Sequence, residues 1–196
     1  MDVKQISNDE LINYFLNQGM FDPVQLASFK YFDPNYVNES LHICCFIKHE
    51  LVGILEYKNK GDIFFVNYVT THPNYRQRGV ATALKRFFLN LIGEEATLVN
   101  SYYTEEGIVL IGLNQRLAEE FKFLNWIHKI EGEYQKVRGP LLKRGDNVVF
   151  KTDHLWIEGN VLDFFCDNRY QIKIKIIGAD LNEYILDHSP DLIKLI

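Results

Sequence analysis

Cysteine is scarce in this chain, and long apolar stretches are missing from it. Among 196 residues there are three cysteines, the adjacent Cys44 and Cys45 and the isolated Cys166. An odd number with this spacing argues against a disulfide framework. No apolar run reaches the ~18 residues that cross a bilayer, and residues 1–5 open no signal-peptide core. We therefore expect a cytoplasmic protein without a membrane-spanning segment.

Positive charge is also in short supply. The net charge is −5, which gives no general footprint for nucleic acid or an anionic membrane. The six histidines and three cysteines show no metal-ligand spacing, so we expect no metal. Hydrophobic and charged contents of 47% and 24% are typical of a globular protein. The chain is therefore expected to bury a sizeable core.

The most informative segment is residues 66–84, where an apolar strand runs into a short turn and then an amphipathic helix. The turn carries Arg76, Gly79 and Ala81 in the spacing Arg-x-x-Gly-x-Ala. The first turn of a helix has backbone N–H groups without internal partners and the positive end of the helix dipole. Small residues let an anion approach these groups, and Arg76 and Arg78 add charge suited to phosphate. The segment predicts a phosphate-binding cradle.

This motif resembles motif A of the GNAT N-acetyltransferase superfamily, in which Arg/Gln-x-x-Gly-x-Gly/Ala follows a strand. Residues 72–76 are also similar to that family's approach to the loop. The resemblance implies that the loop binds the pyrophosphate of acetyl-coenzyme A and that the neighbouring strands hold its pantetheine arm. The implied cofactor-binding residues are Val69, Thr70, Thr71, Arg76, Gln77, Arg78, Gly79, Val80, Ala81, Thr82 and Asn100.

The order of predicted elements extends the resemblance to residues 1–128. The pattern predicts a strand, two helices, three antiparallel strands, a helix, a strand and a last helix. The third antiparallel strand is predicted over residues 63–71 and the helix after it over residues 80–92. The first helix opens at the capping box Ser7–Glu10, and the second at Asp22–Pro23. This is the order of the GNAT fold, an α+β arrangement (α/β mixed sheet). The family usually adds two more strands, for which this chain offers only residues 126–130.

From Gly145 onward the pattern becomes all-strand, with five short apolar runs between polar turns. Strict alternation over residues 171–176 is typical of a strand with one buried face. Short, closely spaced strands predict a small Src-homology-3-like β-barrel, weakly similar to Tudor-like barrels. We predict a GNAT-like acetyl-coenzyme A-binding domain over residues 1–135, a linker over 136–144 and a barrel domain over 145–196.

The barrel segment is expected to recruit a protein partner or to complete the acceptor site. Residues 143–196 carry 7 Lys+Arg against 9 Asp+Glu, which disfavours binding to duplex phosphates. Neither nucleic acid nor a membrane is an expected partner. The oligomeric state stays open, with a homodimer as one option.

The catalytic residues are less clearly marked. The resemblance implies a base two residues before Val69, where this chain has Asn67, whose amide cannot accept a proton at neutral pH. Glu56 on the preceding strand and a water chain are the alternatives. The acid that protonates the leaving thiolate is implied to be a tyrosine, and Tyr102 and Tyr103 are the candidates, of which strand alternation lets one face the site. The competing interpretation makes Glu56 a solvent-facing strand residue and both tyrosines sheet-edge side chains.

The sequence thus favours an N-acetyltransferase that moves an acetyl group from acetyl-coenzyme A to a primary amine of a small molecule, peptide or protein. Direct attack in a ternary complex is the expected route, with much of the rate coming from holding amine and thioester together. The alternative is a catalytically degenerate acyl-coenzyme A sensor or interaction module, which Asn67 and the absence of tyrosine from residues 107–126 favour.

Overall fold

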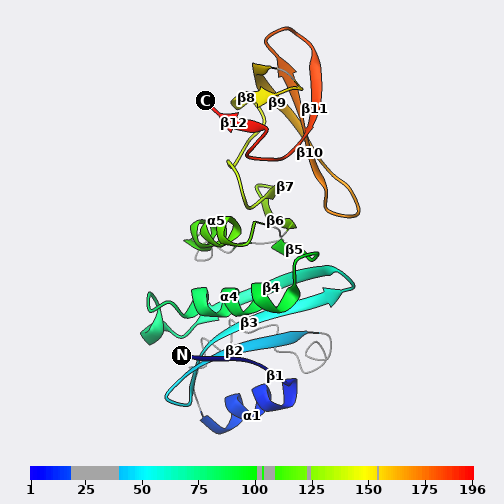
Figure 1. Ribbon diagram of the computed structural model, residues 1–196. Helices are drawn as coiled ribbons and strands as arrows, with labels where there is room; N and C mark the ends of the chain where they lie inside the picture. The colour runs from blue at the N-terminus through cyan, green and yellow to red at the C-terminus, as the bar shows by residue number, and fades with distance from the viewer. Residues whose placement is uncertain (19–39, 101–102, 104–108, 123–124, 154) are drawn as a thin grey trace. The chain divides into compact units, whose positions relative to one another are not determined.

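The computed structural model describes residues 1–18, 40–100, 103, 109–122, 125–153 and 155–196 (Figure 1). Its contacts divide the chain into two compact units, Met1–Ala96 and Thr97–Ile196. Each unit has a hydrophobic core of its own. The helix predicted to start at Asp22–Pro23 lies outside the described residues.

The first unit is built on four antiparallel strands, each paired with its neighbour in sequence. The strand predicted over residues 63–71 and the helix predicted over residues 80–92 are confirmed with the predicted bounds. The elements of this unit are β1 (Asp2–Ile6), α1 (Asn8–Gln18), β2 (Leu41–Ile47), β3 (Glu50–Lys60), β4 (Ile63–Thr71), the 3-10 helix η1 (Pro73–Tyr75) and α4 (Val80–Ile92).

Helix α1 begins with the predicted capping box. The Ser7 N–H donates to Glu10 Oε2 at 3.0 Å, and the Glu10 N–H donates to Ser7 Oγ at 3.2 Å. These bonds satisfy two donors that a helix start would otherwise leave unpaired. Leu11 of α1 then packs into a buried cluster with side chains of β1, β2 and β3: Ile6, Cys44, Phe46, Leu51 and Ile54. Cys44 is thus a packing residue of this core.

Helix α4 packs against the sheet at a point of close approach. A Cβ built on Gly53 of β3 would overlap the Val80 side chain and lie 3.1 Å from Leu84 Cδ1. Glycine at this position therefore lets the start of α4 lie directly on β3. Since Val80 is the first residue of α4, the contact fixes the end of the helix that follows the Arg-x-x-Gly-x-Ala turn.

The second unit contains the remaining elements. They are β5 (Thr97–Asn100), α5 (Leu110–Glu120), β6 (Asn125–Ile130), β7 (Glu133–Lys136), β8 (Asn147–Lys151), β9 (Trp156–Cys166), β10 (Ile172–Gly178), β11 (Glu183–Asp187) and β12 (Ile193–Leu195). β5 runs parallel to β6, and β6 runs antiparallel to β7. The expectation of a single strand after the last helix is wrong, because β7 follows β6. Its sequence, Glu-Tyr-Gln-Lys, carries no apolar alternation that would have predicted a strand.

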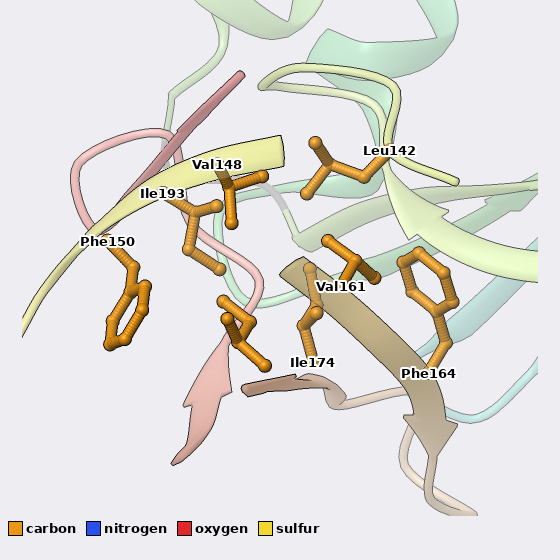
Figure 2. Close-up of a cluster of buried hydrophobic side chains, with 8 residues drawn as sticks. Leu142, Val148, Phe150, Val161, Phe164, Ile174 and Ile193 are labelled. Atoms are coloured by element: carbon orange, nitrogen blue, oxygen red, sulfur yellow. The ribbon is translucent and has the colours of Figure 1, made fainter. Parts of the chain in front are cut away.

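The C-terminal strands form one antiparallel sheet in the order β11-β10-β9-β8-β12. In this order β11 and β12 are the two edges, so the sheet is open and the predicted Src-homology-3-like barrel is not confirmed. One face of the sheet carries the buried cluster drawn in Figure 2, which comprises Leu142, Val148, Phe150, Val161, Phe164, Ile174, Ile176 and Ile193. The alternation predicted along β10 is confirmed, with Ile172, Ile174 and Ile176 buried.

The segment predicted as a linker is tied into the second unit. Leu142 belongs to the C-terminal core, and its N–H and carbonyl groups bond to the buried Gln135 side chain at 2.9 and 2.7 Å. Lys143 pairs with Glu131 at 3.0 Å, and Arg144 also lies in ion pairs. The predicted division into domains over residues 1–135 and 145–196 stays a prediction.

Candidate functional site

The candidate anion site begins where β4 ends. His72 caps η1, since its Nδ1 accepts the N–H of Asn74 at 3.3 Å and its carbonyl oxygen accepts the N–H of Tyr75 at 2.8 Å. The exposed residues 76–79 follow, and α4 starts directly after them. The predicted order of strand, turn and helix is confirmed.

Two residues with left-handed backbone conformation shape this turn. Gln77 has φ 61° and Gly79 has φ 81°, a region that glycine enters without steric cost. Among the residues that the structure describes, a Cβ on Gly79 would meet a single atom within 4 Å, Met1 Cε at 3.8 Å. The backbone conformation, rather than crowding by the described residues, therefore calls for glycine.

The start of α4 presents backbone donors. The first intrahelical bond runs from the Ala83 N–H to the Gly79 carbonyl oxygen at 2.9 Å. The N–H groups of Val80, Ala81 and Thr82 precede that bond, and a helix leaves such groups without an internal partner. Gly79, the N-cap residue, has no side chain that could bond to them. Together with the helix dipole, these donors make the start of α4 suited to an anion.

Arg78 is held beside the turn by an aromatic ring. Its guanidinium lies 5.4 Å from the centroid of the Tyr75 ring, and the Tyr75 hydroxyl donates to Glu50 Oε2 at 2.6 Å. The bond to Glu50 raises the pKa of Tyr75. A hollow of about 480 Å³ adjoins this group, lined by Glu50, Leu51, Val52, His72, Asn74, Tyr75 and Arg78. Backbone donors, a helix dipole and guanidinium groups are the features that fit a diphosphate.

The other predicted cofactor residues lie on two strands. Val69, Thr70 and Thr71 are half-buried and pair with β3, and their contact with the pantetheine arm stays a prediction. Asn100 is buried at the end of β5, where its Oδ1 accepts the Trp126 indole N–H at 2.7 Å. Its predicted contact with the cofactor arm also stays a prediction.

β4 carries a bulge at Asn67. On β3, Glu56 pairs with Tyr68 and Tyr57 pairs with Val66, so Asn67 is the extra residue. Bulges are frequent next to active sites, where they re-aim a side chain. Asn67 is exposed, and its Nδ2 donates to Glu56 Oε1 at 2.8 Å. The structure therefore brings these two candidate catalytic residues into direct contact.

Glu56 is half-buried, so the interpretation of it as a solvent-facing residue is wrong. Its side chain is 14% exposed, and its Oε2 lies 3.6 Å from His42 Nε2. Its Oε1 also accepts the Ser40 hydroxyl at 3.0 Å. Burial alone would raise the pKa of Glu56, but the contacts with His42, Asn67 and Ser40 together lower its pKa below the usual value. Because a general base works best with a pKa near the operating pH, this environment disfavours Glu56 as a base.

Sequence reasoning missed the residues behind Glu56. His42 is 2% exposed, and its Nδ1 lies 2.9 Å from Oδ1 of Asn8, the first residue of α1. The pairing of His42 with Glu56 across β2 and β3 depends on the register of the two strands, which no sequence signal specified.

Tyr103 belongs to the second unit. Its hydroxyl accepts a hydrogen bond from Asn114 Nδ2 at 2.7 Å and lies 3.2 Å from His128 Nδ1. Burial raises the pKa of Tyr103 to about 12, against the opposing effect of the Asn114 bond. The proton therefore stays on the phenol at neutral pH. Tyr102, the other candidate acid, lies outside the described residues.

Neither a metal centre nor a membrane span emerges from the described part of the chain. Within it, no group of three or more His, Cys, Asp or Glu side chains is placed to hold a metal ion. None of the helices described is long and apolar enough to cross a membrane.

No family model and no curated protein matches this chain. Solved structures do resemble it, and they include N-acetyltransferases. The ribosomal-protein-S18-alanine N-acetyltransferase from Escherichia coli is 13% identical, with a TM-score of 0.37 over 46% of this chain and 58% of that one. The present chain thus spans less than two thirds of the length of the E. coli enzyme.

Two further similar structures are also N-acetyltransferases. The aminoglycoside 6'-N-acetyltransferase from Acinetobacter haemolyticus is 16% identical, with a TM-score of 0.41 over 60% of this chain and 89% of that one. The PaiA N-acetyltransferase from Thermoplasma acidophilum, solved in complex with coenzyme A, is 15% identical, with a TM-score of 0.35 over 47% of this chain and 72% of that one.

Proposed function

We propose that this chain is an acetyl-coenzyme A-dependent N-acetyltransferase of the GNAT type that acts on a primary amine. The observation that carries the proposal is the turn between β4 and α4. There a left-handed Gly79 precedes a helix start that rests on Gly53 of β3. The backbone donors of this helix start and the nearby Arg78 are suited to a diphosphate.

Residues of this turn would hold the diphosphate of the cofactor, Val69, Thr70 and Thr71 of β4 its pantetheine arm, and Asn67 of β4 the acceptor. The N–H groups of residues 77–82 bind the diphosphate, with Arg76 and Arg78 at the rim. Bound acetyl-coenzyme A supplies an acetyl group activated as a thioester. The acceptor nitrogen bonds to the acetyl carbon as the carbon–sulfur bond breaks, and sulfur keeps the electron pair. Nitrogen loses one proton and sulfur gains one, so the products are an amide and a thiol.

We assign the positioning of the amine to Asn67 of β4. It is exposed at a bulge, and its amide orients a partner without taking a proton. Catalysis would then rest chiefly on holding the amine in place, a contribution that can be large. Tyr103 is retained as the candidate acid. The identity of the amine, whether on a small molecule, a peptide or a protein, stays a prediction.

A sensor that binds acyl-coenzyme A without transferring the acetyl group is the second candidate. The observation that favours a sensor is the environment of the candidate acid Tyr103. Its hydroxyl already accepts a hydrogen bond from Asn114 and lies beside His128, so these contacts compete with protonation of a thiolate. Release of free thiol from acetyl-coenzyme A in the presence of a panel of primary amines separates the two candidates. An enzyme releases thiol in proportion to acetylated amine, and a sensor releases none.

The cofactor site is tested by Gly79→Glu. A carboxylate at the start of α4 would face the diphosphate, and two unit charges 4 Å apart near a protein surface repel by about 4 kcal/mol. We expect the affinity for coenzyme A, measured by calorimetry, to fall by roughly a hundredfold or more. The matched control is Gly93→Glu, because Gly93 caps the other end of α4 with the same φ of 81°. Equal affinities of these two variants for coenzyme A would defeat the proposal.

The C-terminal sheet is proposed to recruit a protein partner. Its exposed apolar side chains include Trp156, Phe165 and Ile185. A protein that binds there should lose affinity when Phe165→Ser removes exposed apolar area, while coenzyme A binding stays unchanged.

A further inference from the structure

The contact between Asn67 and Glu56 settles which way the Asn67 amide faces. An ionised carboxylate can only accept hydrogen bonds, so the NH2 group of Asn67 must be the group that lies 2.8 Å from Glu56 Oε1. The carbonyl oxygen Oδ1 is then directed away from Glu56. Since Asn67 is exposed, this oxygen is available to a donor from outside the protein.

Glu56 is itself held in place. Ser40 donates to the same Oε1 at 3.0 Å, and His42 Nε2 lies 3.6 Å from Oε2. His42 in turn lies 2.9 Å from Asn8 at the start of α1. The carboxylate thus has a polar neighbour on each oxygen, and its side chain is 14% exposed. Its place is fixed by β2, β3 and the first residue of α1.

The ionised state of Glu56 maintains its hydrogen bond with the Asn67 amide. Its pKa lies below the usual value of 4.5 because the contacts with its neighbours outweigh the effect of burial. At neutral pH the carboxylate is therefore ionised and remains an acceptor. The same low pKa makes it a weak proton acceptor, which is the opposite of what a general base requires.

We propose that Glu56 is a positioning residue that acts through Asn67. In this arrangement Asn67 Oδ1 accepts an N–H of the acceptor's primary amine and directs the nitrogen lone pair at the acetyl carbon. Glu56 locks the amide in that orientation, and Ser40 and His42 hold Glu56. The inference rests on the proposed acetyltransferase function and assigns a positioning role to Glu56, which was one of the two alternatives for the base.

A double-mutant cycle tests whether Glu56 acts through Asn67. We measure kcat/KM for the amine at saturating acetyl-coenzyme A in Asn67→Ala, Glu56→Ala and the double variant. Loss of one hydrogen bond predicts a decrease of roughly 3- to 10-fold in each single variant. The double variant should be no worse than Asn67→Ala alone, because Glu56 has nothing left to position. The proposal is overturned if the fold-decrease in kcat/KM of the double variant equals the product of the two single decreases. It is also overturned if Asn67→Ala has the kcat/KM of the wild type.

The conservative variant Glu56→Gln separates positioning from base catalysis. A glutamine oxygen can still accept from Asn67 but cannot take a proton at neutral pH. We expect Glu56→Gln to retain kcat/KM within about threefold and to keep the acid limb of the wild-type pH profile. Loss of activity comparable to that of Glu56→Ala would make Glu56 a base and overturn the proposal. Asn59→Ala, an exposed amide on the same strand, is the matched control.

The orientation of Asn67 can also be read without activity. The side-chain NH2 resonances of Asn67 should shift as Glu56 is protonated, with a midpoint below pH 4.5. The shift should be absent in Glu56→Gln. If these resonances do not change with pH in the wild-type protein, Glu56 does not hold the Asn67 amide and the proposal is wrong. If the lock is present but no primary amine is acetylated, the proposed function fails and the role of Asn67 toward an amine fails with it.

Discussion

Two buried histidines should make the unit Thr97–Ile196 sensitive to acid. The side chains of His128 and His188 are both 0% exposed. Burial lowers the pKa of each from 6.5 to about 4, and the charge of His188 adds to the effect at His128. Nδ1 of His188 accepts the Lys136 N–H at 3.0 Å, and Nδ1 of His128 lies 3.2 Å from the Tyr103 hydroxyl. Both imidazoles are therefore neutral in the folded protein at pH 7.

The sign of the effect follows from which state binds protons. Between pH 6.5 and pH 4 the unfolded chain protonates these histidines and the folded chain does not, so stability falls as the pH falls. A pKa lowered from 6.5 to about 4 corresponds to about 3 kcal/mol for each histidine below pH 4, and to about 2 kcal/mol at pH 5.

Urea unfolding at pH 7.5 and pH 5, followed by tryptophan fluorescence, measures this loss in one unit. Both tryptophans of the chain, Trp126 and Trp156, lie in this unit. His188→Asn keeps an acceptor for the Lys136 N–H and removes the titrating group. We expect the free energy of unfolding of this variant to fall between the two pH values by about 2 kcal/mol less than that of the wild type.

The matched control is His49→Asn, at an exposed turn with φ 69° that asparagine also adopts. It should show the wild-type pH dependence. If His188→Asn and the wild type lose the same free energy between pH 7.5 and pH 5, then His188 is not a buried neutral histidine, and the reasoning from burial fails.

Other substitutions probe packing and buried polar groups. Gly53→Ala should destabilise the protein by about 1–3 kcal/mol in urea unfolding, because the new Cβ overlaps Val80; an unchanged midpoint would show that α4 does not rest on β3. Gly112→Ala on α5, where a Cβ meets no atom of the described residues within 4 Å, should instead stabilise by about 0.5–1 kcal/mol. Gln135→Leu leaves the buried Leu142 N–H and carbonyl unpaired and should cost at least about 1–3 kcal/mol. A neutral effect of Gln135→Leu would mean that water replaces the amide.

Sequence patterns predicted a helix or strand correctly where the residues of that element alone specify it. The capping box at Ser7 and Glu10, the strand Ile63–Thr71 and the helix Val80–Ile92 could all be predicted from neighbouring residues. Each depends on contacts within a few positions of the chain. The strand β7 was missed because Gln135 is buried through a hydrogen bond to Leu142, and apolar periodicity does not report such burial.

The pairing of strands was beyond the sequence, because bulges shift the register. Counting back from the pair of Ile47 with Glu50 without a bulge would place Leu55 opposite His42. The extra residue Val52 of β3 moves Glu56 into that position. A bulge inserts one extra residue into one strand, and the hydrophobic alternation of the sequence does not reveal where it lies. The contacts of His42 and Ser40 with Glu56 could therefore not be read from the chain.

The sequence by itself determined the strand, turn and helix that form the candidate anion site, because this order depends only on adjacent residues. The tertiary structure alone decided the state of the catalytic candidates. It buried Glu56 among polar neighbours, placed Asn67 at a bulge and surrounded Tyr103 with Asn114 and His128. The openness of the C-terminal sheet was likewise decided by which strands pair. The physical reason is that pKa values, amide orientation and sheet closure depend on groups far apart in the chain.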